Sequence, residues 1–221
     1  MALKEKDFIE IEFTGKVKGG DIFDSNVKKD IEEAGLKLEA KPFAFSLDQG
    51  MFLKGVDKFL IGKEIGDHKI ELKPEEAFGI RDSKLVQKLP MKAFVQQQLN
   101  PIPGAMFNFD GKIGKILTVS GGRVIVDFNN PIAGKEVVYN IKVLRKIDNQ
   151  DEKIKSFNEF LFKKDFKFEI KDKKLILEVE KQMAGFVKMF AEKFKEVFDL
   201  ELEVKEVKET KKEESKEAKK E

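Results

Sequence analysis

Four short segments in which apolar and polar residues alternate limit the folds that this chain can adopt. Period-two alternation puts apolar side chains on one face of a strand, so each segment predicts half-buried strand structure. The segments lie at residues 8 to 24, which include a Gly19-Gly20 turn, and at 42 to 47, 70 to 72 and 139 to 143. A short apolar stretch from Val56 to Ile61 has the spacing of a helix. Together these features predict an α+β fold in which an antiparallel sheet wraps around a short helix.

The stretch between Asp82 and Asn130 differs from its surroundings, with a polar helical segment and a Pro-rich turn before several strand-like runs. These runs lie at residues 105 to 109, 113 to 119 and 123 to 128, with turn signals between them. The first type of alternation resumes further along the chain. We therefore predict a small β-rich domain at residues 84–131, inserted into a domain made of residues 1–83 and 132–150.

The apolar pattern of residues 152–207 predicts a third domain with a ββαβ-like order of elements. The two strands are predicted at 166 to 170 and 175 to 179, the helix at 183 to 198, and the closing strand at 200 to 204. So small a core leaves the opposite sheet face exposed, which favours a homodimer; the alternative is a monomeric domain packed on its neighbour. Lys and Glu dominate from Glu203 onward, and we expect a disordered charged tail at 208–221.

Composition excludes most enzyme chemistries. The 221 residues include no cysteine and one histidine, His68, so thiolate chemistry is excluded and a catalytic triad or zinc site is hard to assemble. A formal net charge of +2 provides no strong attraction to nucleic acid. No apolar run matches a membrane span and the first residues lack a secretory pattern, so we expect a cytoplasmic protein. The 38% charged content favours a thermophilic source.

Three motifs carry a resemblance to a known family. They are FTGKVKGGDIFD (13–24), PFAFSLDQGMFLKGVDKFLIGKEIGD (42–67) and KPEEAFG (73–79). In order and spacing they resemble the FKBP family of prolyl isomerases. The continuations DSKLVQKLPMKAF and NPIAGKEVVYNIKVLRKI are similar to the SlyD-like subgroup, in which a substrate-binding domain interrupts the flap. The resemblance covers about residues 5 to 148, and some archaeal members carry a C-terminal extension like the one that follows.

The resemblance implies an FKBP-like half-barrel, a peptidyl-prolyl cis-trans isomerase activity without cofactor or metal, and a specific site. It implies that Asp24 is the pocket carboxylate, that the Leu53 N–H meets the substrate carbonyl, and that Val56 is the pocket floor. We assign four residues to the catalytic set: Asp24, Phe43, Leu53 and Phe78. The walls and flap are implied at Phe13, Phe23, Phe43, Phe52, Phe78 and Tyr139, and at Ile132 and Ala133. Taken singly, each Phe has an alternative as a core residue, and Asp24 as a helix cap.

The chemistry expected of such a site needs neither nucleophile nor metal. An X-Pro bond exchanges slowly because its partial double bond gives a barrier of about 20 kcal/mol. A pocket that strips water from the carbonyl and holds the proline against aromatic walls favours the twisted amide over the planar one. A rate gain of ~10³ to 10⁶ requires ~4 to 8 kcal/mol of such preference.

The site departs from its relatives at three positions. Phenylalanine replaces the expected tyrosine at Phe13 and Phe78, which removes two hydroxyls, and Val56 stands where many members have tryptophan. Each lost hydrogen bond costs about 0.5 to 1.5 kcal/mol, so intrinsic activity should fall modestly. The tail lacks the His- and Cys-rich composition of some SlyD-like proteins, so we predict no nickel role.

The partners that we expect are unfolded or nascent polypeptides that contain proline. Exposed apolar residues of the insert would capture these chains and raise their local concentration at the pocket. The candidates are Met91, Phe94, Val95, Ile102 and Met106, and the alternative is that they form the core of the insert. The rival function is a non-enzymatic holdase that binds unfolded chains, and a ribosome-bound factor is a weaker third.

Overall fold

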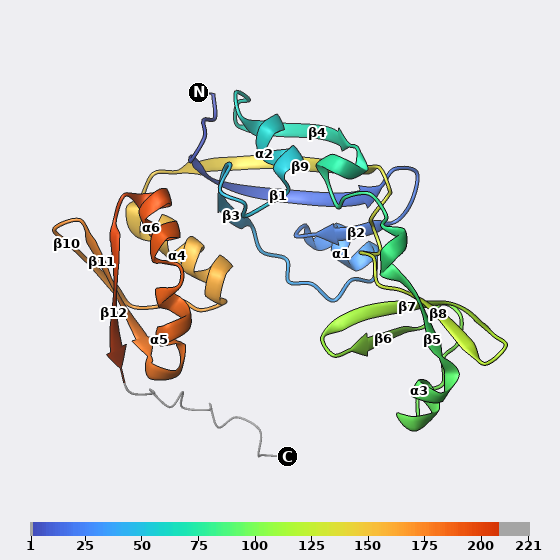
Figure 1. Cartoon of the computed structure of the whole chain (residues 1–221). Coiled ribbons are helices and arrows are strands. Elements are labelled where there is room, and N and C mark those ends of the chain that lie inside the picture. Colours follow the sequence, from blue (N-terminus) through green and yellow to red (C-terminus); the bar gives the residue numbers. More distant parts are fainter. Residues whose placement is uncertain (1, 208–221) are drawn as a thin grey trace, which may run out of the picture.

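The computed structural model describes residues 2–207, and its central feature is an antiparallel sheet that we call the main sheet (Figure 1). Its strand order is β2-β1-β9-β4, and β3 also pairs with β1. The strands are β1 (Phe8–Val17), β2 (Ile22–Ser25), β3 (Phe43–Ser46), β4 (Gly66–Leu72) and β9 (Val137–Ile147). Two short helices, α1 (Lys28–Glu33) and α2 (Lys54–Leu60), accompany it. The predicted α+β class, with an antiparallel sheet around a short helix, is confirmed.

The core of this region lies between the inner face of the main sheet and α2. Alternate residues of β1, Ile9, Ile11 and Phe13, are buried there, and Val56 and Leu60 of α2 are fully buried against them. Alternation therefore places one face of each strand toward the helix, as the pattern predicts. Among the described residues, no helix combines the length and apolar character needed to cross a membrane.

The insert, residues 84–131, builds a separate four-stranded sheet of order β5-β8-β7-β6. Its elements are β5 (Val86–Pro90), α3 (Met91–Gln96), β6 (Met106–Phe109), β7 (Lys112–Ser120) and β8 (Arg123–Asp127). Two 3-10 turns, η1 (Pro74–Glu76) and η2 (Ser83–Leu85), precede it along the chain. Three strands and the helix match the sequence analysis. Strand β5 was not predicted; it is an edge strand that ends in Pro90, a residue that edge strands tolerate.

The C-terminal unit, residues 149–207, is a three-stranded sheet with helices, and it keeps the predicted order of two strands, a helical segment and a closing strand. Its elements are α4 (Gln150–Phe162), β10 (Phe168–Lys171), β11 (Lys174–Glu180), α5 (Lys181–Lys188), α6 (Ala191–Phe198) and β12 (Glu201–Val207). Strand β11 pairs antiparallel with β10 and parallel with β12. Helix α4 is additional, and the single predicted helix is two.

Two differences between the predicted and the observed C-terminal unit have local causes. Helix α4 begins in the charged stretch after Ile147 because the Asn149 side chain accepts a hydrogen bond from the Glu152 N–H at 2.9 Å, which caps the helix. The closing strand, predicted to end at residue 204, continues as β12 to Val207, because residues 205–207 also pair with β11. The predicted disordered tail at 208–221 lies outside the described residues.

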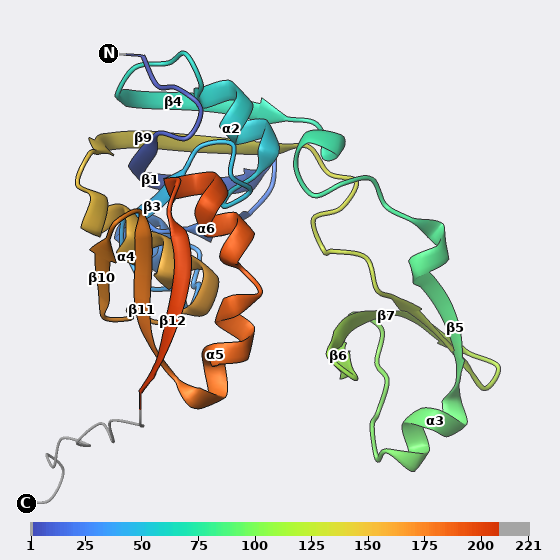
Figure 2. The same cartoon turned by 60° about the vertical axis from the view of Figure 1, so that its left-hand side comes forward.

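The C-terminal unit and the main sheet share one continuous core. On α4, the Phe157 ring lies 5.1 Å from the Phe194 ring and 5.3 Å from the Phe198 ring, centroid to centroid. Phe198 in turn stacks on Phe8 of β1 at 5.6 Å. The insert instead has a core of its own, built around Phe94. Figure 2 shows the insert standing apart from the C-terminal unit.

Candidate active site

Six aromatic side chains form one connected cluster on the inner side of the main sheet. Phe52 is its centre, with ring centroids 5.0 Å from Phe13, 5.8 Å from Phe43 and 5.7 Å from Tyr139. The cluster continues from Tyr139 to Phe23 at 5.9 Å and from Phe23 to Phe78 at 5.4 Å. All six rings predicted as pocket walls are thus brought together. Phe13 and Tyr139 are buried, whereas the other four are half-buried and keep part of each ring open.

Local strand geometry explains how these rings converge. Gly15 of β1 pairs with Tyr139 of β9 across the sheet. A Cβ atom at Gly15 would lie 2.7 Å from Cε1 of Tyr139 and 3.0 Å from Cζ of Phe23, distances that are too short for real contacts. The absence of a side chain at Gly15 therefore lets both rings lie directly against the strand.

Two further predicted site residues, Leu53 and Val56, lie at the start of α2. Val56 is 0% exposed and belongs to the same core cluster as the rings. Leu53 is the N-cap residue of α2, and its carbonyl accepts hydrogen bonds from the N–H groups of Val56 at 2.9 Å and Asp57 at 3.0 Å. The Leu53 N–H donates to no acceptor within residues 2–207. That donor is therefore open to a hydrogen bond with water or with a bound molecule.

Asp24 is the half-buried carboxylate at the edge of the ring cluster. Burial raises its pKa above the ordinary value, and a hydrogen bond from the Ser25 backbone opposes this shift. The pKa of Tyr139 is also raised, first by burial and then by the charge of Asp24. Asp24 does not cap a helix, because the N-cap residue of α1 is Val27. The helix-cap alternative for Asp24 is therefore wrong.

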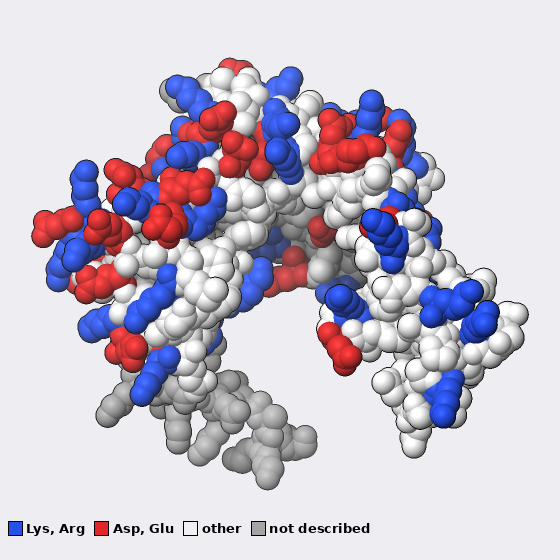
Figure 3. Space-filling view, in the orientation of Figure 1, with Lys and Arg blue, Asp and Glu red and all other residues white. Residues whose placement is uncertain are grey.

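A cavity of about 650 Å³ opens beside these rings. Phe13, Asp24, Phe43 and Phe52 line its inner part. Its outer part is lined by the segment before β3 and by α4, including Phe160. Figure 3 shows the surface hollowed below the main sheet, between the C-terminal unit and the insert.

Two structural contributors to this cavity were missed from the sequence. Asn26 accepts a hydrogen bond from the Phe13 N–H at 2.7 Å and donates to the Ile11 and Lys41 carbonyls, both at 3.0 Å. It thereby ties β1 to the segment before β3, and its position directly after the Phe23-Asp24-Ser25 step was the available signal. Phe160 was missed because α4 was not predicted.

Comparisons with known proteins agree with this geometry. A model of the FKBP-type peptidyl-prolyl cis-trans isomerase family matches residues 1–96, and a model of the FKBP26 IF domain matches residues 87–132. An FKBP-type 16 kDa peptidyl-prolyl cis-trans isomerase of Escherichia coli is 34% identical over 110 residues, which are 47% of this chain and 73% of that protein. The chain belongs to the FKBP-type peptidyl-prolyl cis-trans isomerase family.

Other FKBP-type relatives cover more of the chain. The short-type peptidyl-prolyl cis-trans isomerase of Methanocaldococcus jannaschii is 29% identical over 145 residues, covering 64% of this chain and 92% of that protein. The SlyD protein of Helicobacter pylori is 28% identical over 149 residues, covering 65% and 75%. A structure of the three FKBP domains of wheat FKBP73 matches with a TM-score of 0.36 and 15% identity, covering 66% and 41%, which is too weak to support any argument.

The two residues predicted to form the flap separate from each other. Ile132 packs against the main core, and the turn is held where the Gly134 N–H donates to the Gly79 carbonyl at 2.9 Å, next to Phe78. Ala133 instead lines a different hollow of about 260 Å³ between the turn and the insert. Neither residue lines the 650 Å³ cavity.

The five candidate capture residues of the insert fall into two groups. Val95, Ile102 and Met106 are 64%, 56% and 57% exposed. Phe94 is 1% exposed and Met91 packs against the same small core. For Phe94 the core alternative is therefore correct, because its side chain is not accessible to a client.

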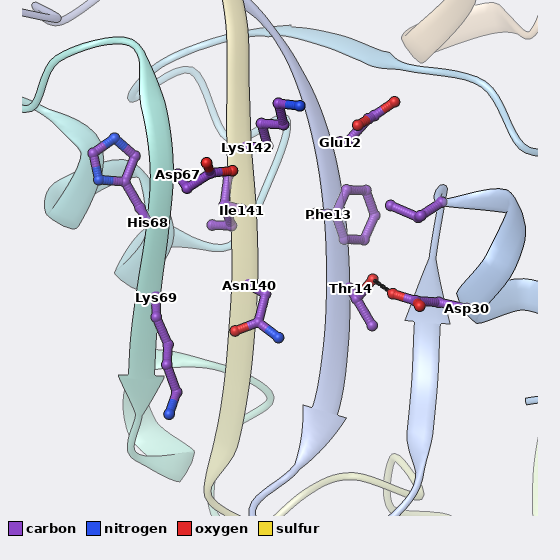
Figure 4. Close-up of a pocket in the computed structure, with 11 residues that line it drawn as sticks. Glu12, Phe13, Thr14, Asp30, Asp67, His68, Lys69, Asn140, Ile141 and Lys142 are labelled. Atoms are coloured by element: carbon purple, nitrogen blue, oxygen red, sulfur yellow. Dashed lines mark hydrogen bonds between the residues drawn. The ribbon is translucent and has the colours of Figure 1, made fainter. Parts of the chain in front are cut away.

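A second hollow, of about 450 Å³, is associated with the other face of the main sheet (Figure 4). Side chains of alternating charge lie in neighbouring strands there, with Lys142 paired in register with both Glu12 and Asp67. His68 contacts the Glu64 carbonyl at 2.8 Å near its edge. Most of its lining is charged or polar, and Phe13 is the one phenylalanine that lines it.

Proposed function

We propose that this chain isomerises X-Pro bonds of unfolded or partly folded polypeptides by desolvation in its aromatic cavity. The observation that carries the proposal is the cluster of six rings, three of which, Phe13, Phe43 and Phe52, line the 650 Å³ cavity. The rings would hold the proline side chain, and the Leu53 N–H would hold the substrate carbonyl. Isomerisation needs no proton transfer, because only the amide resonance is lost in the twisted state.

The balance of forces in this cavity favours desolvation over hydrogen bonding. Phe13 and Phe78 carry no hydroxyl, so neither can hydrogen-bond the carboxylate or the substrate carbonyl. The raised pKa of Asp24 reflects a poorly hydrated environment at the edge of the rings. Removing water from the substrate carbonyl destabilises the polar planar amide more than the twisted form, which lowers the barrier.

The insert would capture unfolded polypeptide chains. Its exposed residues Val95, Ile102 and Met106 offer apolar surface to an unfolded chain. Met106 also lines the hollow that Ala133 of the flap shares with the insert, so captured segments would be held near the cavity. Linked binding of this kind raises the effective concentration of prolines at the active site without new chemistry.

A refolding assay on a substrate limited by proline isomerisation tests the enzyme proposal against the holdase. Phe43→Ala should lower kcat/KM about tenfold, equivalent to ~1.4 kcal/mol, because a main wall is lost. The matched control is Phe186→Ala, which removes a half-exposed ring outside the cavity. If the wild-type chain leaves the slow refolding phase as slow as buffer does, the holdase is the correct function.

A homodimer through the C-terminal unit stays a prediction, but the exposed sheet face is not the apolar surface on which the prediction was based. The outer face of this sheet is exposed, but it carries ion pairs such as Lys205–Glu178 at 2.8 Å and Lys174–Glu203 at 3.5 Å. This charged face lacks the apolar surface that the dimer argument assumed. Light scattering on the full-length chain tests it, and a mass of one chain would contradict it.

A further inference from the structure

Helix α4 forms a wall of the same cavity that the aromatic cluster opens into. Phe160 lies 6.4 Å from Phe43, centroid to centroid, and Phe43 is a wall of the proposed proline site. The cavity is lined at once by Phe43, Phe52 and Phe160. A polypeptide whose proline occupies the inner part must therefore pass α4 or the segment facing it.

The outer part of the cavity has apolar side chains among charged ones. Leu38, Pro42 and Ala44 line it together with Phe160. Leu38 is 46% exposed, which is unusual for a large apolar residue that faces a cavity, and Phe160 is only partly buried. Apolar side chains left open beside an active site are typical of a surface that a ligand covers.

Several of the charges around this part are paired with one another. Glu159 of α4 binds Lys41 at 2.7 Å, across from helix to loop. Arg145 of β9 binds Glu10 at 2.7 Å and also contacts Glu152 of α4. Three of the five acidic side chains of the lining thus have a cationic partner. The Lys163 Nζ lies 5.9 Å from the Phe160 ring centroid, so an apolar ligand group would meet this ring beside an ammonium group.

The same ion pairs hold α4 in place. Lys41 joins the helix to the segment before β3, and Arg145 joins it to the main sheet. The shared core around Phe157 fixes the helix from its other side. The wall is thus formed before any ligand arrives, which reduces the entropic cost of binding.

We infer that α4 carries a second subsite of the active site, which takes an apolar side chain that flanks the substrate proline. The inference rests on the proposed isomerase function of the aromatic cavity. The 6.4 Å between the Phe43 and Phe160 rings corresponds to about two residues of extended chain. The side chain that reaches Phe160 therefore lies two or three positions from the proline.

Peptide turnover by the full-length protein tests the subsite. The probes are eight-residue peptides with one proline and either leucine or serine at one position two or three residues from it, on either side. A four-residue proline peptide with alanine at its other positions, which offers Phe160 no large apolar side chain, is the reference. The wild-type chain should prefer leucine over serine five- to tenfold in kcat/KM at one position, ~1 to 1.4 kcal/mol.

Variants separate the subsite from a structural role. Phe160→Ala should abolish the leucine preference by lowering turnover of the leucine peptide to that of the serine peptide, and Phe160→Leu should restore most of the preference. The matched control on α4 is Lys155→Ala, an exposed position outside the cavity, which should change nothing.

Three results would overturn the inference: equal turnover of leucine and serine peptides at every position, a preference that survives Phe160→Ala, or an equal loss on all peptides. Failure of the proposed function looks different, because the wild-type chain would then not turn over the four-residue peptide. In that event, peptide affinities from fluorescence anisotropy provide the same leucine-to-serine ratio.

Discussion

The insert and the C-terminal unit are both attached to the main sheet, but they are attached in opposite ways. The insert has an independent core around Phe94, Ile116 and Val126. The C-terminal unit continues the core of the main sheet through stacked rings from Phe8 to Phe157. The insert is therefore built as a separable module, whereas the C-terminal unit is part of the domain that carries the active site.

Contacts at the two junctions agree with this difference. At the root of the insert, Arg81 binds Asp127 at 2.6 Å and Asn129 hydrogen-bonds the Asp82 backbone, and these polar groups lie near the surface. At the C-terminal junction the ring contacts are buried, and ion pairs surround them. Only the insert can therefore change its position without exposing the core that the main sheet shares with the C-terminal unit.

The largest expected effect compares two core phenylalanines. Phe157→Ala should destabilise the main sheet and the C-terminal unit together by about 3 to 5 kcal/mol, because both lose packing around one cavity. Phe94→Ala should loosen the insert alone. Urea unfolding followed by native-state hydrogen exchange measures both. Faster exchange in β1 and β9 of the Phe94→Ala variant would contradict the separation of the two cores.

The second prediction concerns the pH dependence of stability, which depends on the carboxyl group of Asp57 in α2. Burial raises the pKa of Asp57 to about 7, the charge of Asp48 adds to the rise, and the Asp48 backbone N–H opposes it. Its Oδ1 atom has no hydrogen-bond partner in the structure. Because the folded-state pKa exceeds the unfolded value of about 4, the carboxyl favours folding fully below pH 4, and that contribution is lost as pH rises to about 7.

The expected outcome is that wild-type stability falls relative to Asp57→Asn between pH 4 and 7. The difference should be on the order of 2 to 4 kcal/mol and constant above pH 7. Urea unfolding at a series of pH values measures it. Since Asp57 lies in the shared core, hydrogen exchange in the insert should not follow the same pH dependence; if it does, the insert is coupled to that core.

The third effect separates capture from chemistry. Replacing Val95, Ile102 and Met106 together by serine should slow refolding of a proline-limited protein about tenfold, because the chain is no longer held near the cavity. Turnover of a four-residue proline peptide should not change. The control replaces the exposed Gln96 and Gln97 by serine. An equal loss on the peptide would show that the insert shapes the active site itself.

The smallest effect concerns the two side-chain caps at the junctions. Asn149→Ala removes the cap of α4 and should cost about 1 kcal/mol, or about 3 °C in the melting temperature of the shared core. Asp82→Ala removes the equivalent cap of η2, where its Oδ1 accepts the Lys84 N–H at 2.8 Å. That change should leave the main melting transition in place. Calorimetry of both variants measures the difference.

The main sheet was predictable because its information is local. Period-two alternation in β1, β3, β4 and β9 reports the burial of one strand face, and a hairpin needs only a nearby turn. The converging rings came from the family resemblance, which placed residues that are distant in sequence. Helix α4 escaped prediction because its first turn is charged, although Ile154, Phe157 and Leu161 have helical spacing.

The sequence could not show which side chains are buried or which residues line a cavity, and the reason is different. Phe94 and Val95 are neighbours on α3, yet one is in the core and the other is exposed, and only the packed insert distinguishes them. Ile132 and Ala133 separate in the same way, since the direction of each side chain depends on how the turn packs.

By itself, the sequence determined which residue types the proposed active site can contain. The absence of cysteine, the single histidine and the spaced phenylalanines restrict it to an aromatic pocket poor in hydrogen-bonding groups, because these are properties of residue type. Only the tertiary structure decided what surrounds that pocket. Phe160 and Lys41 are far apart in sequence from one another, and they meet at one cavity because the shared core brings α4 against the main sheet.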